Sequence, residues 1–224
     1  ENIIKSCEKV GRDPKEVTLI AVSKTKPYTA IEEALPSGVL DYGENKVQEL
    51  CGKMEQLPSD IRWHMIGHLQ RNKVRQVVDK TVLIHSVDSV RLAAQIDEEA
   101  AKKGITADIL LEVNVAAEES KYGFRLEETE QALREIAAFS HVHIQGLMTI
   151  APFVDNSEEN RPIFKKLYQF YVDMRGKNID NVTMSMLSMG MTGDYEVAIE
   201  EGATLVRVGT GIFDTRYKIG ENEG

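Results

Sequence analysis

A lysine at the end of an apolar run has the clearest chemical potential in this sequence. Lys24 follows six strand-like residues, 17–22, within the string Ala-Val-Ser-Lys-Thr-Lys-Pro at residues 21–27. Burial lowers the pKa of a lysine amine, and the free amine can condense with an aldehyde to form a Schiff base. An ordinary exposed lysine is the structural alternative, since most lysines are solvated. Lys24 is thus a candidate attachment point for an aldehyde.

Two glycine-rich segments near the other end of the chain are suited to binding a phosphate group. They read Ser-Met-Gly-Met-Thr-Gly at residues 188–193 and Arg-Val-Gly-Thr-Gly at residues 207–211. Glycine lets the backbone approach a ligand closely, and Ser188 and Thr210 carry hydroxyl donors. A lysine for an aldehyde and a rim for a phosphate together predict pyridoxal 5'-phosphate as the cofactor. A sugar phosphate held by an aldolase-type lysine is the alternative ligand.

Alternating strand-like and helix-like runs must position these residues. Hydrophobic periodicity and turn residues predict eight strands, at residues 17–24, 39–44, 61–67, 81–87, 107–115, 142–150, 182–189 and 205–213. Helices are predicted between them at residues 29–35, 46–57, 69–79, 89–103, 126–139, 158–175 and 194–201. Eight such repeats favour a single α/β domain over residues 1–224, a (β/α)8 TIM barrel. An open doubly wound sheet is less well supported, because no Gly-x-Gly-x-x-Gly motif follows the first strand.

The start of the chain adds one further expectation. No full eighth helix is apparent after residue 213, whereas Ile3, Ile4, Cys7 and Val10 have helical spacing. We expect this amphipathic segment to cover barrel surface that the missing helix leaves bare.

A barrel of this class places its chemistry at the carboxyl ends of its strands. Lys24 would end the first strand there, and the two glycine-rich segments would follow the last two. Period-two alternation puts Arg207 on the face opposite Val206 and Val208, so its guanidinium should point into the barrel. An arginine facing a pyridine nitrogen would keep that nitrogen unprotonated and make the ring a weak electron sink. An ion pair between Arg207 and Glu112 is the structural alternative.

Seven short motifs together resemble the YggS/PROSC family of pyridoxal phosphate homeostasis proteins. They are A-V-S-K-T-K-P at 21–27, G-E-N at 43–45, W-H-M-I-G at 63–67, K-Y-G-F at 121–124, G-L-M at 146–148, L-S-M-G-M at 187–191 and V-R-V-G-T-G-I-F at 206–213. The resemblance covers about residues 15–216 and implies a barrel similar to the amino-terminal domain of alanine racemase. The site residues it implies are Lys24 as the internal aldimine, Arg207 at the pyridine nitrogen, Ser188, Gly209 and Thr210 at the phosphate, and Asn45 near the cofactor. Thr192 stands where many relatives have serine, which preserves a hydroxyl.

The expected lack of a second acid/base group favours a carrier over an enzyme. Two-base racemisation needs a second acid/base group, which alanine racemases take from a second domain, and we expect no such domain in this chain. We therefore predict a non-catalytic protein that buffers pyridoxal phosphate and passes it to apo-enzymes through Lys24. The competing hypothesis is a weak pyridoxal-dependent racemase or lyase whose second base is Tyr42, His64 or Tyr122.

Charge and composition limit the classes of partner that this protein is expected to bind. The 27 basic and 36 acidic side chains give a net charge of −9, which argues against a nucleic-acid or anionic-membrane surface. No apolar run approaches the roughly 18 residues that cross a bilayer, and the first residues lack a signal-peptide layout. We expect a cytoplasmic monomer. Neither Cys7 and Cys51 nor the pair His141 and His143 has a spacing and position that predict a metal site.

Overall fold

The structure is a computed structural model that describes residues 1–213, and its centre is a closed barrel of parallel strands. The barrel strands are β1 (Thr18–Val22), β2 (Asp41–Glu44), β3 (Arg62–Met65), β4 (Leu83–Val87), β5 (Ala107–Asn114), β7 (Val142–Met148), β8 (Val182–Met191) and β9 (Leu205–Val208). They lie in the order β4-β3-β2-β1-β9-β8-β7-β5, and a pairing between β4 and β5 closes the ring. The predicted eight-stranded barrel is confirmed. A two-residue strand, β6 (Phe124–Arg125), adds an unpredicted pairing to β5.

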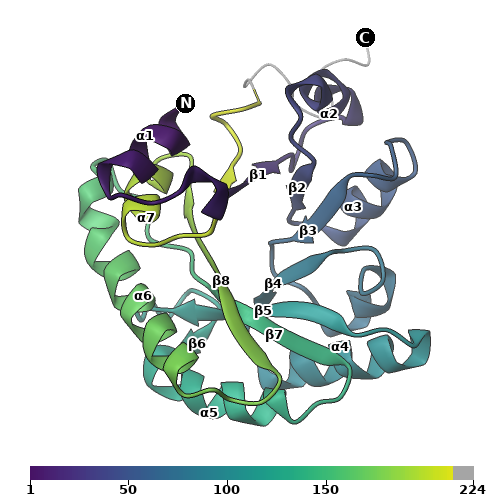
Figure 1. Ribbon diagram of the computed structural model, residues 1–224. Coiled ribbons are helices and arrows are strands. Elements are labelled where there is room, and N and C mark those ends of the chain that lie inside the picture. Colours follow the sequence, from purple (N-terminus) through teal and green to yellow (C-terminus); the bar gives the residue numbers. More distant parts are fainter. Residues whose placement is uncertain (214–224) are drawn as a thin grey trace.

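Helices cover the outside of the barrel (Figure 1). The α-helices are α1 (Asn2–Lys9), α2 (Tyr28–Ala34), α3 (Val47–Met54), α4 (Val90–Lys103), α5 (Leu126–Ala137), α6 (Arg161–Gly176) and α7 (Tyr195–Glu200). Short 3-10 helices occur at η1 (Pro14–Glu16), η2 (Leu35–Ser37), η3 (Arg71–Gln76) and η4 (Ser157–Asn160). Within the described chain, no helix is both long and apolar enough to span a bilayer.

The helix predicted at residues 69–79 is wrong in type. Its place is taken by the 3-10 helix η3. Val74, Val77 and Val78 are buried in this segment, and the N–H groups of Val77 and Val78 both donate to the carbonyl of Val74. Because β-branched residues have low helix propensity, tertiary burial and not an α-helical ladder fixes this connection.

Side-chain alternation along the strands separates two apolar clusters. The large one lies between the strands and the helices and includes Val206. The small one lies inside the barrel and consists of Ile20, Leu83, Leu110, Met148 and Leu205. Arg207 is therefore on the interior face of β9, as the alternation of the sequence predicts.

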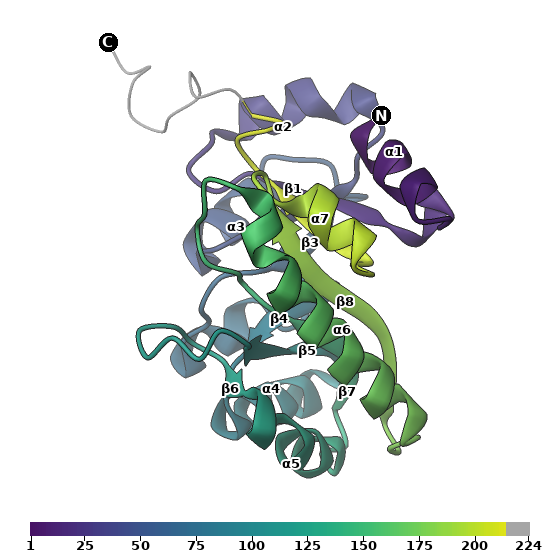
Figure 2. The same cartoon turned by 90° about the vertical axis from the view of Figure 1, so that its left-hand side faces the viewer.

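The first helix packs beside the last one, as both Figure 1 and Figure 2 show. Arg12, just after α1, donates to the carbonyl of Ile199 at 2.6 Å, and Cys7 is fully buried. Ile4 and Val10, however, are 47% and 42% exposed, so only part of the predicted apolar face is used. The segment in which no eighth helix is expected lies outside the described residues.

Gly190 lets the end of β8 and the start of α7 approach closely. Its φ is +94°, a value that favours glycine, and a Cβ there would lie 2.6 Å from Cβ of Ala198 and 2.9 Å from Cα of Tyr195. No atom lies within 4 Å of a Cβ built on Gly193, in the same loop. The backbone between these glycines is thus held by steric constraint at Gly190.

We expect Gly190→Ala to lower the free energy of unfolding by about 2–4 kcal/mol, from backbone strain and overpacking combined. The matched variant Gly193→Ala should change it by less than about 0.5 kcal/mol. Urea denaturation of both variants measures the difference. Equal stabilities would contradict the packing described here.

Candidate functional site

A cavity of about 600 Å³ opens at the carboxyl ends of the barrel strands. Five of the six predicted site residues contribute to its wall: Lys24, Asn45, Arg207, Gly209 and Thr210. They come from the ends of β1, β2 and β9, which are neighbours in the barrel. Ile66, Ile150 and Phe153 supply apolar surface to the same wall. The sequence thus identified one pocket from residues that lie far apart along the chain.

The turn that carries Lys24 is held by polar contacts from α3. The amide of Thr25 donates to Glu49 at 2.8 Å, and Nζ of Lys53 donates to the carbonyl of Ser23 at 2.7 Å. Thr25 has a φ of 61°, a left-handed conformation that is costly for a β-branched residue. The backbone is therefore strained at the edge of the pocket. These contacts fix the backbone on both sides of Lys24.

A buried ion pair lies beneath that turn. Glu44 is fully buried, and its Oε1 accepts hydrogen bonds from Nζ of Lys53 and from the hydroxyl of Ser23, both at 2.5 Å. Burial raises the pKa of the Glu44 carboxyl, while the Lys53 ammonium opposes that rise. Breaking such a pair leaves an uncompensated charge, so α3 is tied to the turn of Lys24.

Lys24 itself is exposed. The burial predicted from the apolar run before it is therefore wrong, because the buried run ends at Ser23 and the chain then turns to the mouth of the pocket. The side chain still lines the cavity. Its position favours access from solvent over desolvation of the amine.

Arg207 forms the floor of the pocket and is 4% exposed. One terminal nitrogen donates to the hydroxyl of Ser188, and the other donates to the carbonyl of Thr149 at 2.9 Å. Burial lowers the pKa of Arg207 to about 10, although Glu112 and Asp194 oppose the shift. Within the described chain no ion pair joins Arg207 to Glu112, so the alternative pairing considered for Arg207 is wrong.

Ser188 does not reach the wall of the pocket. Its side chain is fully buried, and its hydroxyl contacts Arg207 and Nδ1 of His85, the latter at 2.8 Å. The expected placement of Ser188 on a phosphate rim is therefore incorrect. It lies on the interior face of β8 beneath the cavity, where its partners are side chains of the protein.

Thr192 stands on the rim instead. It lines the cavity together with Gly193, and its hydroxyl oxygen accepts the backbone N–H of Gly209 at 3.2 Å. β8 extends to Met191, two residues beyond the predicted end. Because the strand continues to Met191, Ser188 lies inside the barrel and Thr192 lies just past the end of the strand. A correct strand boundary would have identified Thr192 as the rim residue.

Glu112 is a second pocket residue whose role sequence reasoning missed. It lines the cavity and is 6% exposed. Burial raises the pKa of its carboxyl to about 7, the charge of Asp88 adds to the rise, and Arg207 opposes it. A glutamate on the interior face of a buried strand, without a neighbouring basic residue in the sequence, was the available signal.

Aromatic side chains border the mouth of the pocket. The rings of His68 and Tyr122 stack with centroids 3.9 Å apart, and Nδ1 of His68 lies 3.0 Å from Asp88. Of the three residues considered as a second base, Tyr122 lines this cavity, whereas Tyr42 is fully buried in the outer core. His64 lies inside the barrel with both ring nitrogens in hydrogen bonds.

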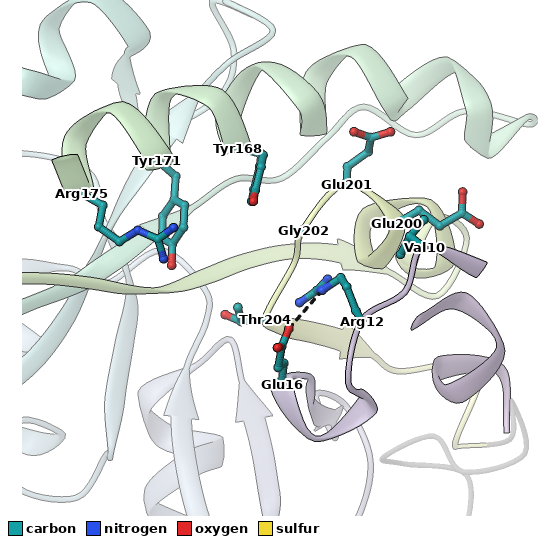
Figure 3. Close-up of a pocket in the computed structure, with 10 residues that line it drawn as sticks. All are labelled: Val10, Arg12, Glu16, Tyr168, Tyr171, Arg175, Glu200, Glu201, Gly202 and Thr204. Atoms are coloured by element: carbon teal, nitrogen blue, oxygen red, sulfur yellow. Dashed lines mark hydrogen bonds and ion pairs between the residues drawn. The ribbon is translucent and has the colours of Figure 1, made fainter. Parts of the chain in front are cut away.

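A second hollow of about 410 Å³ lies outside the barrel, beside α6 (Figure 3). Its charged side chains contact one another, the backbone or neighbouring side chains, and Arg175 lies over the ring of Tyr171. Arg12 contacts Glu16 and the carbonyl of Ile199, and Glu200 and Glu201 both contact Arg161. These pairings leave the cavity in the barrel as the candidate functional site.

The chain is similar to known proteins over nearly its whole length. Residues 2–216 match the family described as alanine racemase, N-terminal domain. The chain is 44% identical over 217 residues to the pyridoxal phosphate homeostasis protein of Aquifex aeolicus. This match covers 96% of this chain and 94% of that protein. It is 36% identical to the protein of the same name from Escherichia coli K12, over 96% of this chain and 93% of that one.

Solved structures extend the comparison. PipY from Synechococcus elongatus, solved with pyridoxal phosphate bound, has a TM-score of 0.81 and 34% identity, covering 95% of this chain and all (100%) of that one. An alanine racemase from Clostridium difficile has a TM-score of 0.72 at 16% identity and shares the fold. The chain belongs to the family of pyridoxal phosphate homeostasis proteins, within the alanine racemase N-terminal domain class, as its motifs predict.

The raised pKa of Glu112 predicts how stability depends on pH. The folded protein holds this proton more tightly than the unfolded chain, whose carboxyl has its ordinary pKa of 4.5. The free energy of unfolding should therefore fall as the pH rises from about 4.5 to about 7. Glu112→Gln should match the parent below about pH 4 and exceed its stability by up to about 3 kcal/mol above about pH 8.

Urea denaturation across this pH range measures the difference between the two proteins. Glu119→Gln, at an exposed glutamate of the neighbouring loop, is the matched control and should follow the parent throughout. A difference between Glu112→Gln and the parent that does not vary with pH would contradict the buried-carboxyl account.

Proposed function

We propose that this protein binds pyridoxal 5'-phosphate in the barrel cavity, with Lys24 joined to its aldehyde, and stores or delivers it in the cytoplasm without catalysing a reaction. The observation that carries the proposal is the meeting of three different groups around one cavity of about 600 Å³: the amine of Lys24, the guanidinium of Arg207 and the rim of Thr192, Gly209 and Thr210. The names of the relatives and the cofactor in the PipY structure support the same ligand.

The residues fit the three polar features of this cofactor. The amine of Lys24 can condense with the aldehyde and release water. Arg207 donates hydrogen bonds and accepts none, which suits an unprotonated ring nitrogen. Thr192 and Thr210 offer hydroxyl donors beside the glycine backbone for the phosphate, while Asn45 contributes to the wall near Lys24. Ser188 then has a supporting role, as the buried partner of Arg207.

The placement of the three residues considered as a second base supports a carrier. When bound, pyridoxal phosphate supplies an aldehyde and a ring that can withdraw electrons. Racemisation also requires an acid/base group on each face of the substrate. Tyr42 and His64 lie away from the cavity, and Tyr122 is 58% exposed and stacked on His68. Arg207 at the ring nitrogen would further weaken electron withdrawal.

The exposure of Lys24 supports delivery. An incoming amine can reach a group attached at the mouth of the cavity, and exchange of one amine for another on the aldehyde needs no net water. The recipients we propose are apo-enzymes that hold the cofactor through their own lysine. We propose that the carrier acts as a single-domain monomer, so that the mouth of its cavity remains open to them.

Covalent attachment has a direct optical test. Protein incubated with pyridoxal phosphate should show a band near about 420 nm that borohydride removes, and mass spectrometry should find the reduced adduct on Lys24. Lys24→Arg keeps the positive charge but cannot form the imine, so the band should be absent. Lys46→Arg, beside Asn45, is the matched control and should retain it. A sugar-phosphate ligand predicts no such band.

The carrier and enzyme alternatives differ in exchange of the substrate α proton. The loaded protein, incubated with a single enantiomer of alanine in deuterated water, should incorporate no deuterium at a catalytic rate. Stereospecific incorporation that Lys24→Arg abolishes would establish an enzyme instead. Its loss in Tyr122→Phe would then identify Tyr122 as the second base, because this is the candidate base that lines the cavity.

A further inference from the structure

A continuous chain of polar side chains crosses the interior of the barrel. It begins at Asp41, near the amino-terminal ends of the strands, whose Oδ1 lies 2.9 Å from Nε2 of His64. Nδ1 of His64 lies 2.9 Å from Nε2 of His85, and Nδ1 of His85 lies 2.8 Å from the hydroxyl of Ser188. Ser188 in turn accepts a hydrogen bond from Arg207 at the floor of the pocket. One chain thus joins the two ends of the barrel.

The two ends of this chain have fixed hydrogen-bonding roles. Burial acts to raise the pKa of Asp41, but hydrogen bonds from His64 and Arg62 outweigh it and lower the pKa to about 2. Near neutral pH Asp41 is therefore a carboxylate and only accepts. Arg207, at the other end, only donates. Burial is the largest cause that lowers the pKa of His85 well below its usual value, so this imidazole is neutral.

These fixed ends determine where each hydrogen lies. If His64 is also neutral, the carboxylate requires a hydrogen on its Nε2, and its Nδ1 must accept. His85 must then donate from Nε2 and accept at Nδ1, so the hydroxyl of Ser188 donates to His85 and accepts from Arg207. With neutral imidazoles, this is the one arrangement that gives each of the four links a single hydrogen. The carboxylate of Asp41 therefore sets which partner donates in each hydrogen bond between Asp41 and Ser188.

We propose that Asp41, His64, His85 and Ser188 are positioning residues that orient the guanidinium of Arg207 toward the ring nitrogen of the bound cofactor. The hydroxyl of Ser188 is held by His85, and together with the carbonyl of Thr149 it holds both terminal nitrogens of Arg207 from below. The remaining N–H bonds are left for a ligand in the cavity that Arg207 lines. A change at His64, outside the pocket, should therefore alter ligand binding.

The barrel contains a matched polar cluster that lacks this connection. Nδ1 of His143 lies 3.2 Å from Asp108, and its Nε2 lies 2.5 Å from the hydroxyl of Thr183, again near the amino-terminal ends of the strands. This second histidine–aspartate pair resembles the first in chemistry and in its place along the strands, although its side chains are 30% and 43% exposed and those of the first pair are 5% and 10% exposed. Among the described residues, no hydrogen bond or ion pair continues from this cluster to Arg207. His143 is therefore the natural control.

The first test uses the ligand-free parent protein with 15N-labelled histidine and arginine. NMR correlations between ring carbons and nitrogens should place the hydrogen of both His64 and His85 on Nε2, and the Nη signals of Arg207 should be protected from solvent exchange. A hydrogen on Nδ1 of His85 would overturn the proposal. This measurement needs neither a variant nor the cofactor, so it is independent of the proposed function on which the role of the chain rests.

The second test compares three variants of the full chain. His64→Leu removes two links, and we expect it to move the His85 hydrogen, shift the Nη signals of Arg207 and raise the pyridoxal phosphate dissociation constant about tenfold. His64→Gln can donate to Asp41 and accept from His85, so it should stay within about threefold of the parent, and His143→Leu within about twofold. Thermal unfolding of each variant reports any general loss of stability.

The outcomes distinguish the proposed role of the hydrogen-bond chain from a general structural effect and from the proposed function. A folded His64→Leu with unchanged His85 and Arg207 signals would overturn the proposed hydrogen-bond chain. So would a loss of affinity in His64→Gln or His143→Leu as large as that in His64→Leu. Should His64→Leu fail to fold, the hydrogen positions in the parent and the affinity of His64→Gln decide. A parent protein that does not bind pyridoxal phosphate would refute the proposed function while leaving the NMR result to stand.

Discussion

The pairing of the first strand with the last is the contact on which the site depends. β1 and β9 run parallel with Ile20 opposite Arg207 and Ala21 opposite Val208, so residues from the two ends of the chain share one edge. Lys24 and Gly209 line the same cavity only because this register holds. Such distant pairing carries a large loop-closure cost, which the intervening strands reduce by pairing in turn until β4 meets β5.

Closure of the barrel also explains how its buried charged residues are paired. Inward positions on neighbouring strands face one another, so polar residues there must satisfy each other or a ligand. Glu44, which lies outside the ring, is neutralised by Lys53 at 2.5 Å and holds a turn in place. Arg207, inside it, has a hydroxyl and a carbonyl as partners and within the described chain no carboxylate within ion-pair distance. A buried cation with neutral partners is suited to an electron-rich ligand atom.

The sequence predicted the barrel and most of the pocket because both follow from short-range patterns. Alternation along β9 was enough to place Arg207 inside, and the strand ends were enough to bring Lys24 and Thr210 to one rim. It failed where an outcome depends on tertiary packing. The valines of η3 are buried without forming an α-helix, and β8 continues two residues further than predicted, so that Ser188 lies inside the barrel. The hydrogen bond between His64 and His85 joins separate strands, which no local pattern could reveal.

The arrangement as a whole favours holding a ligand over transforming it. Lys24 is exposed, whereas Arg207 is buried and fixed by two hydrogen bonds. A lysine activated for proton transfer is expected to be desolvated, because loss of water is what lowers the pKa of its amine. In the binding mode proposed above, the rigid, desolvated part of the pocket would contact the ring nitrogen of the cofactor, and the accessible part would contact its aldehyde. Such an arrangement would retain the ligand at its ring and leave the proposed covalent link to Lys24 open to exchange.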